Sequence, residues 1–446
     1  MIRSSATARS DLVSAMTSPQ SWDDRRSLDL VRACVAQEVS SGAPPPSDED
    51  DLVRTEVVDS MSWVGILTAI EAATGIQNFG NPWPEGRPQS IRALADAIRE
   101  HSAELARQNT IQPRVSATGS SQIVSVTGWG SAFGSRLVEA AEIERTCGLA
   151  SGTLRDHAGI ESVCQACENE DEVVLAQQAV EAALESAALD ISEVELLVAT
   201  STTFLRLPSL AATLHSRLLL AESSGALDVG GACVGVVQAL ATAKALVAAG
   251  QFRTALVVAS EVPSRRLASS SAPGEFRGLF GDGACALVLS RSESAEGRWK
   301  LGDFIWGCAG AFAASLQLEL LESSELRVEF QSEPLARAAL SQLKRLLQNL
   351  EMLAGKPRSE VTYFAIHEPN PRLVEILSRS DGIPLEKMAP ISRTCGNLGA
   401  ATCGVNLCAA LTKAEAGQTI SEPLVVFVAG VGPGLVFGAT YLERLV

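Results

Sequence analysis

The sequence predicts two structural units, a small all-α unit near the N-terminus and a larger α/β unit behind it. Up to residue 106 the apolar side chains recur at helical spacing, whereas from Ile123 onward short apolar runs alternate with alanine-rich stretches. The larger unit also contains an internal repeat, which indicates two similar halves. With 446 residues, the chain is long enough for both units to enclose a hydrophobic core.

The N-terminal unit contains three helical patterns. The first lies at residues 27–39, the second begins near Ser60 and ends at Gly75, and the third covers residues 90–106. Residues 1–110 hold 16 acidic and 10 basic side chains and no lysine, so the unit is acidic. The boundaries that we predict are a flexible N-terminus at 1–20, a helical domain at 21–106, a linker at 107–121 and the α/β domain at 122–446, with halves at about 122–290 and 291–446.

The larger unit consists of buried strands covered by helices. Apolar runs that fit buried strands lie at residues 123–126, 196–199, 255–259, 284–289 and 424–429. After Cys233 and again after Asn397, an alanine-rich stretch ends in Gly-Gln and leads into a valine-rich run. The repeat predicts halves related by an approximate twofold axis, with Cys233 and Asn397 at related helix starts.

Charge and cysteine content limit the partners and the compartment. The 36 basic and 52 acidic side chains give a net charge of −16, which disfavours nucleic acid and anionic membranes as partners. No run of 18 apolar residues exists, and the first residues lack the apolar block of a secretory signal, although their Arg and Ser also permit an organelle-targeting segment. The ten scattered cysteines fit reduced thiols. We therefore expect a cytoplasmic protein.

Cys233 is the first candidate for a chemical role. It lies in Gly-Gly-Ala-Cys-Val-Gly, between a glycine-rich turn and the start of a long apolar helix. The positive end of the helix dipole would favour the thiolate and lower the pKa of this thiol, which would make it a nucleophile. The alternative is a small buried apolar residue, the common role of a cysteine.

Two further polar residues follow apolar runs. His367 directly follows the run at 361–366 and precedes a proline, so it is placed at a strand end, where catalytic groups of α/β proteins are common. Asn397 lies between glycines before the second alanine-rich helix. Each also fits a capping side chain without chemical function.

From Ile123 to the end, the chain resembles β-ketoacyl-(acyl carrier protein) synthase III and its thiolase-fold relatives. The matching segments are Gly-Gly-Ala-Cys233-Val-Gly, Phe280-Gly-Asp-Gly283, His367-Glu-Pro-Asn370, Gly396-Asn397-Leu-Gly-Ala-Ala and Gly430-Val-Gly432-Pro-Gly434, in the order of the family. The resemblance implies a five-layered, duplicated α/β fold. Three positions depart from the family pattern: His-Gln-Ala-Asn is His-Glu-Pro-Asn here, His-Gly-Asn is Cys-Gly-Asn, and Pro433 interrupts the last glycine loop.

The resemblance also implies an activity. It assigns Cys233 as the acyl acceptor and His367 with Asn397 as donors to the thioester carbonyl of an extender, in a decarboxylative Claisen condensation of fatty-acid or polyketide-like biosynthesis. The amide of Cys233 and that of Gly432 or Gly434 would stabilise the oxyanion, because Pro433 has no N–H. Acyl-CoA or acyl-carrier thioesters would be the substrates, with no metal.

Other functions remain open at this point. One is acyl transfer through Cys233 to a hydroxyl, an amine or a carrier without condensation, and another is a non-catalytic docking scaffold. Thiolase-type acetyl transfer is disfavoured, because no cysteine follows Cys408. The single Cys164-Gln-Ala-Cys167 motif lacks a second pair and a nearby histidine, so zinc or redox chemistry is disfavoured there.

The N-terminal unit resembles an acyl carrier protein through Val58-Asp59-Ser60-Met61. The resemblance implies a four-helix domain with a covalent 4'-phosphopantetheine on Ser60, added by a phosphopantetheinyl transferase. The alternative is an ordinary helix N-cap. We expect the acidic carrier to meet arginines such as Arg265, Arg266 and Arg277, although these are also consistent with solvated surface charges.

A homodimer is expected from the resemblance. A strand at the sheet edge beside Cys233, such as one near residues 196–203, could pair with its copy across a twofold axis.

Overall fold

The computed structural model describes residues 22–39, 45–55, 57–76, 79, 88–102, 123–268, 270–292, 299–321, 326–388, 390–416 and 423–444. The chain divides into two compact units. The first holds the described residues up to 102 together with 331–341 and 379–382, and the second holds the rest. The predictions for the segments 1–20 and 107–121 fall outside the described residues.

The N-terminal unit contains α2 (Asp24–Glu38), α3 (Ser60–Thr74) and α4 (Ile91–Ser102). Their apolar faces meet in one core that includes Val31, Trp63 and Ile98. Helix α3 starts at the N-cap Asp59, whose carboxylate accepts a hydrogen bond from the Ser62 amide at 2.7 Å, and it ends at Gly75 with a φ of 74°. The three helical patterns of the sequence are confirmed, and a fourth helix has no counterpart among the residues described here.

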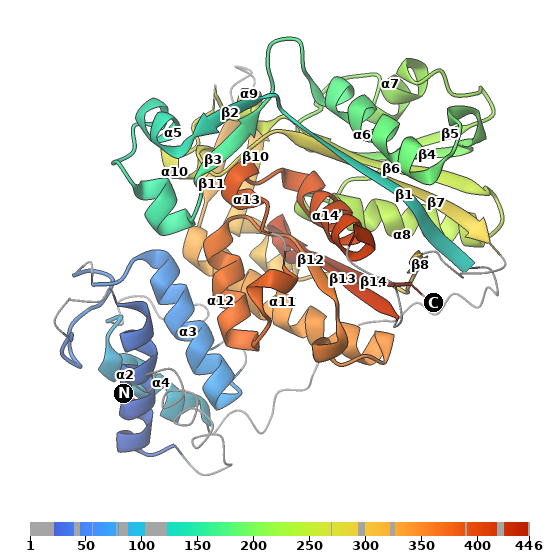
Figure 1. The fold of residues 1–446 in the computed structure, drawn as a ribbon. Helices are drawn as coiled ribbons and strands as arrows, with labels where there is room; N and C mark the ends of the chain where they lie inside the picture. The colour runs from blue at the N-terminus through green and yellow to red at the C-terminus, as the bar shows by residue number, and fades with distance from the viewer. Residues whose placement is uncertain are drawn as a thin grey trace. The chain divides into compact units, whose positions relative to one another are not determined.

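The second unit is built around one long sheet (Figure 1). In order from one edge, its strands are β5 (Gly225–Asp228), β4 (Leu196–Thr200), β6 (Thr254–Glu261), β7 (Gly283–Ser292), β1 (Ile123–Phe133), β8 (Trp299–Leu301), β14 (Val436–Arg444), β13 (Leu424–Gly432) and β12 (Tyr363–Ile366), with β9 (Ile305–Cys308) beside β14.

The pairing pattern of this sheet occurs twice. In the first half β4 and β6 are parallel, and β7 and β1 follow as antiparallel neighbours. In the second half β12 and β13 are parallel, and β14 and β8 follow in the same way. The predicted duplication is therefore confirmed, with the strands β6 and β13 in equivalent places.

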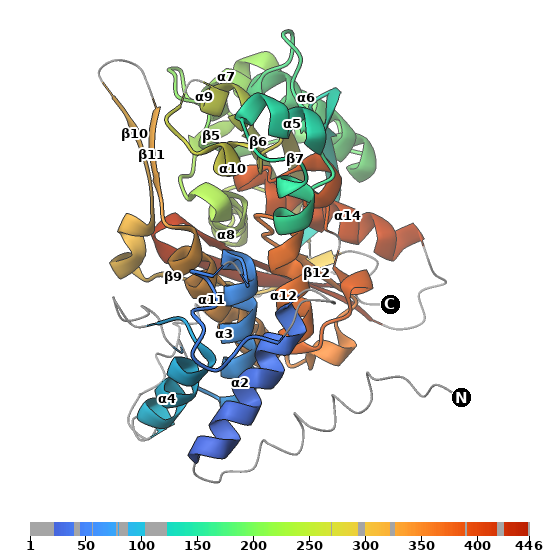
Figure 2. The same ribbon diagram turned by 90° about the vertical axis from the view of Figure 1, so that its left-hand side faces the viewer.

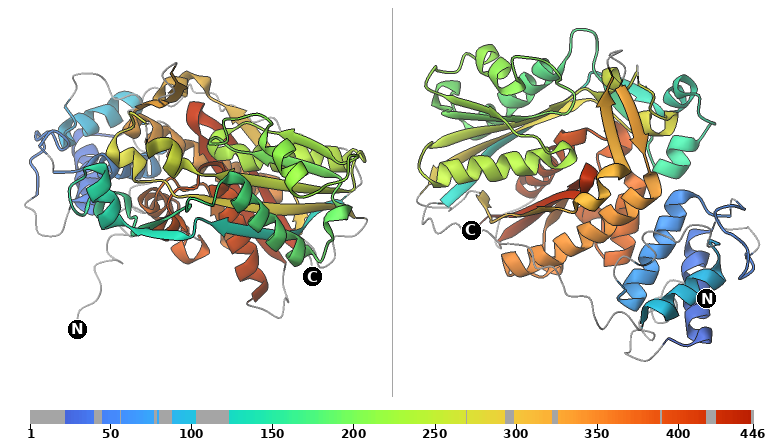
Figure 3. Two further views of the ribbon diagram at one scale, coloured as in Figure 1. Left: turned by 90° about the horizontal axis from the view of Figure 1, so that it is seen from above. Right: turned by 180° about the vertical axis from the view of Figure 1, so that it is seen from behind.

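The two halves of the sheet enclose α8 and α14, and other helices cover the outer face of each half. The unit therefore has five layers. Alternate residues of β6 face opposite ways: Ala255, Val257 and Ala259 share a core with α8 (Gly235–Ala248) and α14 (Thr402–Ala416). Leu256 and Val258 pack instead with α6 (Glu172–Ala187) and α7 (Leu210–Arg217). Helix α12 (Pro371–Asp381) and the C-terminal part of α11 (Ser332–Ala354) form the layer beyond β12 and β13 (Figures 1 and 3).

The remaining elements of this unit are shorter. They are β2 (Arg136–Glu139), α5 (Ala140–Cys147), β3 (Ser162–Gln165), α9 (Pro263–Ala268), α10 (Gly274–Arg277), β10 (Leu316–Leu320), β11 (Leu326–Phe330) and α13 (Ser392–Cys395). Figure 2 shows β10 and β11 as a two-stranded hairpin. Across the described segments, no helix is both long and apolar enough to span a bilayer.

One topological prediction is wrong. The strand at Leu196–Thr200 is β4, which lies between β6 and β5 and is buried at all five positions, so it is not an edge. The edge beside Cys233 is β5. The physical reason is visible in the sequence, because a five-residue run without polar alternation fits a strand covered on both faces.

Candidate active site

Cys233 lies in the short turn that connects β5 to α8. The 3₁₀ turn Ala232–Val234 places it two residues before Gly235, the first residue of α8, and Cys233 is half-buried. Gly432 of β13 faces it: an added Cβ at Gly432 would lie 3.3 Å from the Cys233 Cβ and 3.4 Å from its amide nitrogen. The glycine therefore leaves the space beside the Cys233 amide open.

His367 follows the last residue of β12. Its amide donates to the Ala429 carbonyl at 2.8 Å, which continues the parallel pairing with β13. The neighbouring Gly430 links it to the Cys233 turn, because an added Cβ there would lie 3.5 Å from the His367 Cβ and 3.0 Å from the Val234 Cγ1. The predicted strand-end position of His367 is confirmed.

Asn397 is buried in the turn before α14. Its Oδ1 accepts hydrogen bonds from the Gly399 amide at 3.0 Å and from the Thr402 hydroxyl at 3.1 Å. Because both bonds hold the oxygen, the NH₂ end of the amide faces away from them. The turn Gly399–Ala401 packs against the turn that carries Cys233, and the Cys233 turn also packs against β13. The structure thus brings all three predicted residues to the same end of the sheet.

The imidazole of His367 is neutral at physiological pH. The residue is 5% exposed, and burial lowers its pKa to about 4. Its Nδ1 has no hydrogen-bond partner among the residues described. A neutral imidazole can donate one hydrogen bond without adding a positive charge.

The expected activation of Cys233 by the helix dipole is wrong. Burial, and to a smaller extent the nearby Glu261 carboxylate, raise the pKa of its thiol to about 12. Desolvation and a negative neighbour outweigh the dipole of α8, which begins only at Gly235. Cys233 is therefore a thiol in the resting protein and must lose its proton during attack.

Glu261 is a residue that the sequence analysis missed. It ends β6 with no exposed surface, and its Oε1 accepts hydrogen bonds from the Thr202 amide at 2.8 Å and the Ala400 amide at 3.3 Å. Its Oε2 accepts from the Thr203 amide at 3.1 Å. The carboxylate therefore joins the loop after β4 to the turn that carries Asn397. An acid directly after an apolar run was the available signal.

Glu368 stands where the family has glutamine. It is 1% exposed, and its Oε1 accepts from the Ser392 amide at 3.2 Å and the Asn406 side-chain amide at 3.1 Å. Burial raises its pKa to about 7. A protonated carboxyl has the shape of a glutamine amide and, like it, offers an acceptor oxygen and a donor, which explains how the site accommodates an acid beside His367.

We expect the Glu368→Gln variant to be more stable than wild type at pH 8 and no more stable at pH 5. The folded pKa lies above the unfolded value of about 4.3, so folding favours the proton and wild-type stability falls as pH rises from about 4 to 7. Ionised Glu368 then costs on the order of 4 kcal/mol above pH 7. Urea unfolding at both pH values measures the effect, with the exposed Glu386→Gln as control. An equal shift at both pH values would contradict the prediction.

The last glycine loop allows two backbone donors for an oxyanion. Gly432 lies beside the Cys233 amide, and Gly434 has a φ of 72°, in the left-handed region that glycine tolerates. Pro433 between them starts a 3₁₀ turn and has no N–H to offer. Whether Gly432 or Gly434 donates stays a prediction.

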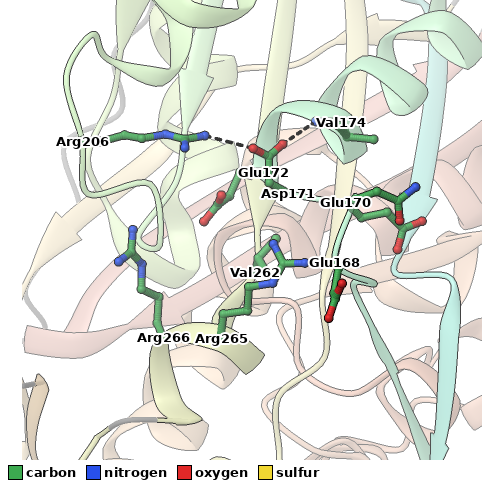
Figure 4. Close-up of a pocket in the computed structure, with 10 residues that line it drawn as sticks. Glu168, Glu170, Asp171, Glu172, Val174, Arg206, Val262, Arg265 and Arg266 are labelled. Carbon is green, nitrogen blue, oxygen red and sulfur yellow. Dashed lines mark hydrogen bonds and ion pairs between the residues drawn. The ribbon is translucent and has the colours of Figure 1, made fainter.

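The predicted carrier-binding arginines make local contacts. Arg265 donates to the Cys167 carbonyl, and the Arg266 Nε donates to the Thr203 carbonyl at 2.8 Å. Both line a pocket of about 390 Å³, in which Arg206 and Asp171 form an ion pair at 3.1 Å (Figure 4). Several carboxylates balance the arginines there, so the pocket is not a cationic patch. A role of these arginines in carrier docking stays a prediction.

Two other predicted positions can be placed. Ser60 is the first residue of α3, directly after the cap Asp59, and its modification stays a prediction. Cys164 and Cys167 are both free thiols, and the described residues contain no group of three or more His, Cys, Asp or Glu that could hold a metal.

Comparisons with known proteins match this unit to one family. The model of 3-oxoacyl-[acyl-carrier-protein] synthase III matches residues 227–310, and the model of its C-terminal part matches 353–444. The β-ketoacyl-[acyl-carrier-protein] synthase III of Ruegeria sp. is 32% identical over 334 residues, which cover 71% of this chain and 98% of the relative. The 3-oxopimeloyl-[acyl-carrier-protein] synthase of Brucella abortus is 32% identical over 330 residues, with the same coverage.

Solved structures agree on the fold. The 3-oxoacyl-[acyl-carrier-protein] synthase III of Aquifex aeolicus superposes with a TM-score of 0.63 at 24% identity, covering 72% of this chain and all of that one. Xanthomonas campestris OleA superposes with a TM-score of 0.64 at 20% identity, covering 72% and 98%. The thiolase-like fold that the sequence predicts is confirmed. The chain belongs to the 3-oxoacyl-[acyl-carrier-protein] synthase III family and is a condensing enzyme of that type.

Proposed function

We propose that the protein joins an acyl group held on Cys233 to a malonyl-type thioester, with release of CO₂ and formation of a β-ketoacyl thioester. The observation that carries this proposal is the neutral pair His367 and Asn397 at the same end of the sheet as Cys233. Two neutral donors suit an enolate intermediate, whereas a carboxylate in either place would repel it.

In the first step the acyl group moves onto Cys233. The sulfur attacks the thioester carbonyl of an acyl-CoA or acyl-carrier donor, and the oxyanion forms beside the Cys233 amide and the glycine loop. The C–S bond to the donor then breaks. The proton of the Cys233 thiol passes to the departing thiolate, so the exchange needs no net acid or base. This route fits a nucleophile whose pKa is raised rather than lowered.

In the second step the extender loses CO₂. Its C–C bond to the carboxylate breaks, and the electron pair moves toward the thioester oxygen, where the His367 Nε2–H and the Asn397 NH₂ donate. The resulting α-carbon attacks the acyl carbonyl on Cys233. The Cys233 thiolate departs from the collapsing tetrahedral adduct and is reprotonated, which completes the cycle.

The test is incubation of the protein with acyl and malonyl thioesters. We expect CO₂ release and a β-ketoacyl product, both reduced by about 10³-fold or more in Cys233→Ala. Cys147→Ala, which removes a partly exposed thiol at the end of α5, is the matched control. Acyl transfer from Cys233 to a hydroxyl, an amine or a carrier without CO₂ release would contradict the proposal and favour the acyltransferase alternative.

We further propose that residues 21–106 form an acyl carrier protein domain whose Ser60 bears 4'-phosphopantetheine, with 107–121 as linker and 122–446 as the condensing domain. The position of Ser60 at the first residue of α3, after Asp59, supports the attachment site. A phosphopantetheinyl transferase would be its partner. The proposed location is the cytoplasm, because a reducing compartment keeps scattered cysteines as thiols.

A homodimer through the β5 edge is also proposed. The edge strand has unpaired backbone groups, and Leu205, Leu207 and Leu219 on adjacent loops are 53%, 91% and 87% exposed. We expect sedimentation at micromolar concentration to give about twice the monomer mass of 46.8 kDa, and Leu207→Asp to lower it. A monomer of the wild-type chain would contradict this.

A further inference from the structure

Two partly exposed cysteines outside the proposed mechanism lie on elements that pack side by side. Cys164 belongs to β3 and Cys395 ends α13, and the carbonyl oxygens of both residues lie within 3.1 Å of a Cβ built on Gly281. The sequence motif pairs Cys164 with Cys167 instead, yet the Cys167 sulfur accepts from the Ser135 hydroxyl at 3.1 Å. In the fold, the cysteine beside Cys164 is therefore Cys395, which is distant in the sequence, and not Cys167.

The backbone on both sides holds the two thiols together. The Ser162 hydroxyl donates to the Thr394 carbonyl at 2.9 Å, so β3 and α13 lie side by side. The Asp282 amide donates to the Cys164 carbonyl at 2.7 Å, and the Cys395 amide donates to the Ile391 carbonyl at 2.9 Å. The Ser162–Thr394 bond thus joins the two elements, and the main-chain bonds fix the backbone of each cysteine.

The two sulfurs differ in protonation. The hydrogen bond with Cys395 and burial raise the pKa of Cys164. The same hydrogen bond lowers the pKa of Cys395, so Cys395 is the thiol of the pair that ionises first. The thiolate is the attacking group in disulfide exchange, and the adjacent Cys164 thiol can resolve the product.

We propose that Cys164 and Cys395 form a reversible disulfide by exchange with a low-molecular-weight disulfide such as oxidised glutathione. The Cys395 thiolate attacks one sulfur of the small disulfide, whose S–S bond breaks and releases one thiolate. Cys164 then loses its proton, attacks the Cys395 sulfur and releases the second thiolate. The protein dithiol is oxidised by two electrons, and the small disulfide is reduced to two thiols.

The bond would act on the turn that carries Asn397. An S–S bond is about 2.05 Å long, much shorter than a thiol hydrogen bond, so the two cysteines must come closer together when it forms. Gly281 packs tightly against this segment. A Cβ added at Gly281 would overlap the Cys395 carbonyl, and the Gly281 amide donates to the Asn397 carbonyl at 3.1 Å. The movement therefore reaches the Asn397 amide, and this consequence rests on the role proposed for Asn397. A displacement of about 1 Å lowers a rate by about 100-fold.

The experiment treats the full chain with oxidised glutathione and maps its cysteines by mass. We expect wild type to lose about 2 Da per chain through one Cys164–Cys395 link, found as a joined peptide after proteolysis. Cys164→Ser should trap glutathione on Cys395, and Cys395→Ser should form no link. Cys167→Ser, which keeps both contacting thiols, is the matched control and should behave as wild type. Absence of the joined peptide from folded wild type would overturn the proposal.

A second measurement follows the catalytic consequence. Cys233 is first acylated, which protects it from exchange, and the malonyl thioester is added after oxidation. We expect CO₂ release from wild type to fall by about 100-fold and to return with a phosphine reductant, which leaves thioesters intact, while Cys164→Ser loses much less. An unchanged rate in the linked protein would refute the effect on Asn397. If the reduced protein releases no CO₂, the proposed condensation is wrong. The presence or absence of the joined peptide still tests whether the Cys164–Cys395 disulfide forms.

Discussion

The Asn397→Asp variant is expected to lower malonyl decarboxylation by about 10²- to 10³-fold, while acylation of Cys233 stays within about threefold of wild type. The substitution keeps the turn, because an aspartate oxygen can still accept from the Gly399 amide and the Thr402 hydroxyl. It removes only the NH₂ donor. An ionised oxygen in its place cannot donate and repels the charge that develops on the extender.

This variant also has a distinctive pH dependence. Asn397 is 3% exposed, so burial will raise the pKa of the introduced carboxyl above its ordinary value. As pH falls, the carboxyl gains a proton and becomes a donor again. We therefore expect the ratio of the variant rate to the wild-type rate to rise toward low pH.

Two readouts separate the steps: the mass of acyl-Cys233, and CO₂ release from a carboxyl-labelled malonyl thioester. Asn169→Asp, at an exposed position, is the control for added charge and should match wild type. Equal losses in acylation and decarboxylation would show that Asn397 acts in both steps or holds the fold. Undiminished decarboxylation at neutral pH would remove Asn397 from the proposed mechanism.

The sequence located the candidate site because its residues lie beside strong patterns. Cys233 and Asn397 precede the two repeated alanine-rich helices, and His367 ends an apolar run, so local periodicity was enough to place each of them. The duplicated pairing of β4-β6-β7-β1 and β12-β13-β14-β8 follows from the same repeat. These features depend on segments that are continuous in the sequence.

Features that depend on contacts between distant segments could not be predicted in this way. The pKa of Cys233 is set by burial and by Glu261, a residue of another strand, and a dipole argument from the helix alone gave the wrong direction. The contact of Cys164 with Cys395 exists only because β3 packs against α13. The edge position of β5 follows from the order of strands, which no single segment specifies.

The second large effect is expected at Ser60. A phosphopantetheinyl transferase should add one phosphopantetheine arm to wild type and none to Ser60→Ala, as measured by intact mass. Alanine is compatible with the first turn of α3, whose cap is the Asp59 carboxylate, so the helix should remain. Ser62→Ala, in the same helical turn, is the matched control and should accept one arm.

A phosphopantetheine arm on Ser60 would let the N-terminal unit carry a thioester, which a serine that only caps a helix cannot do. The predicted linker at 107–121 can reach at most about 50 Å when fully extended, and tethering raises the effective concentration of the carrier to about the millimolar range. Weak docking would then suffice for transfer to Cys233, so Ser60→Ala should lose turnover of substrates loaded on this carrier by about 100-fold or more while free CoA thioesters still react. Should several transferases leave wild type unmodified, or should Ser60→Ala keep full turnover of carrier-loaded substrates, the N-terminal unit has no carrier function, and the condensing unit must draw both thioesters from solution.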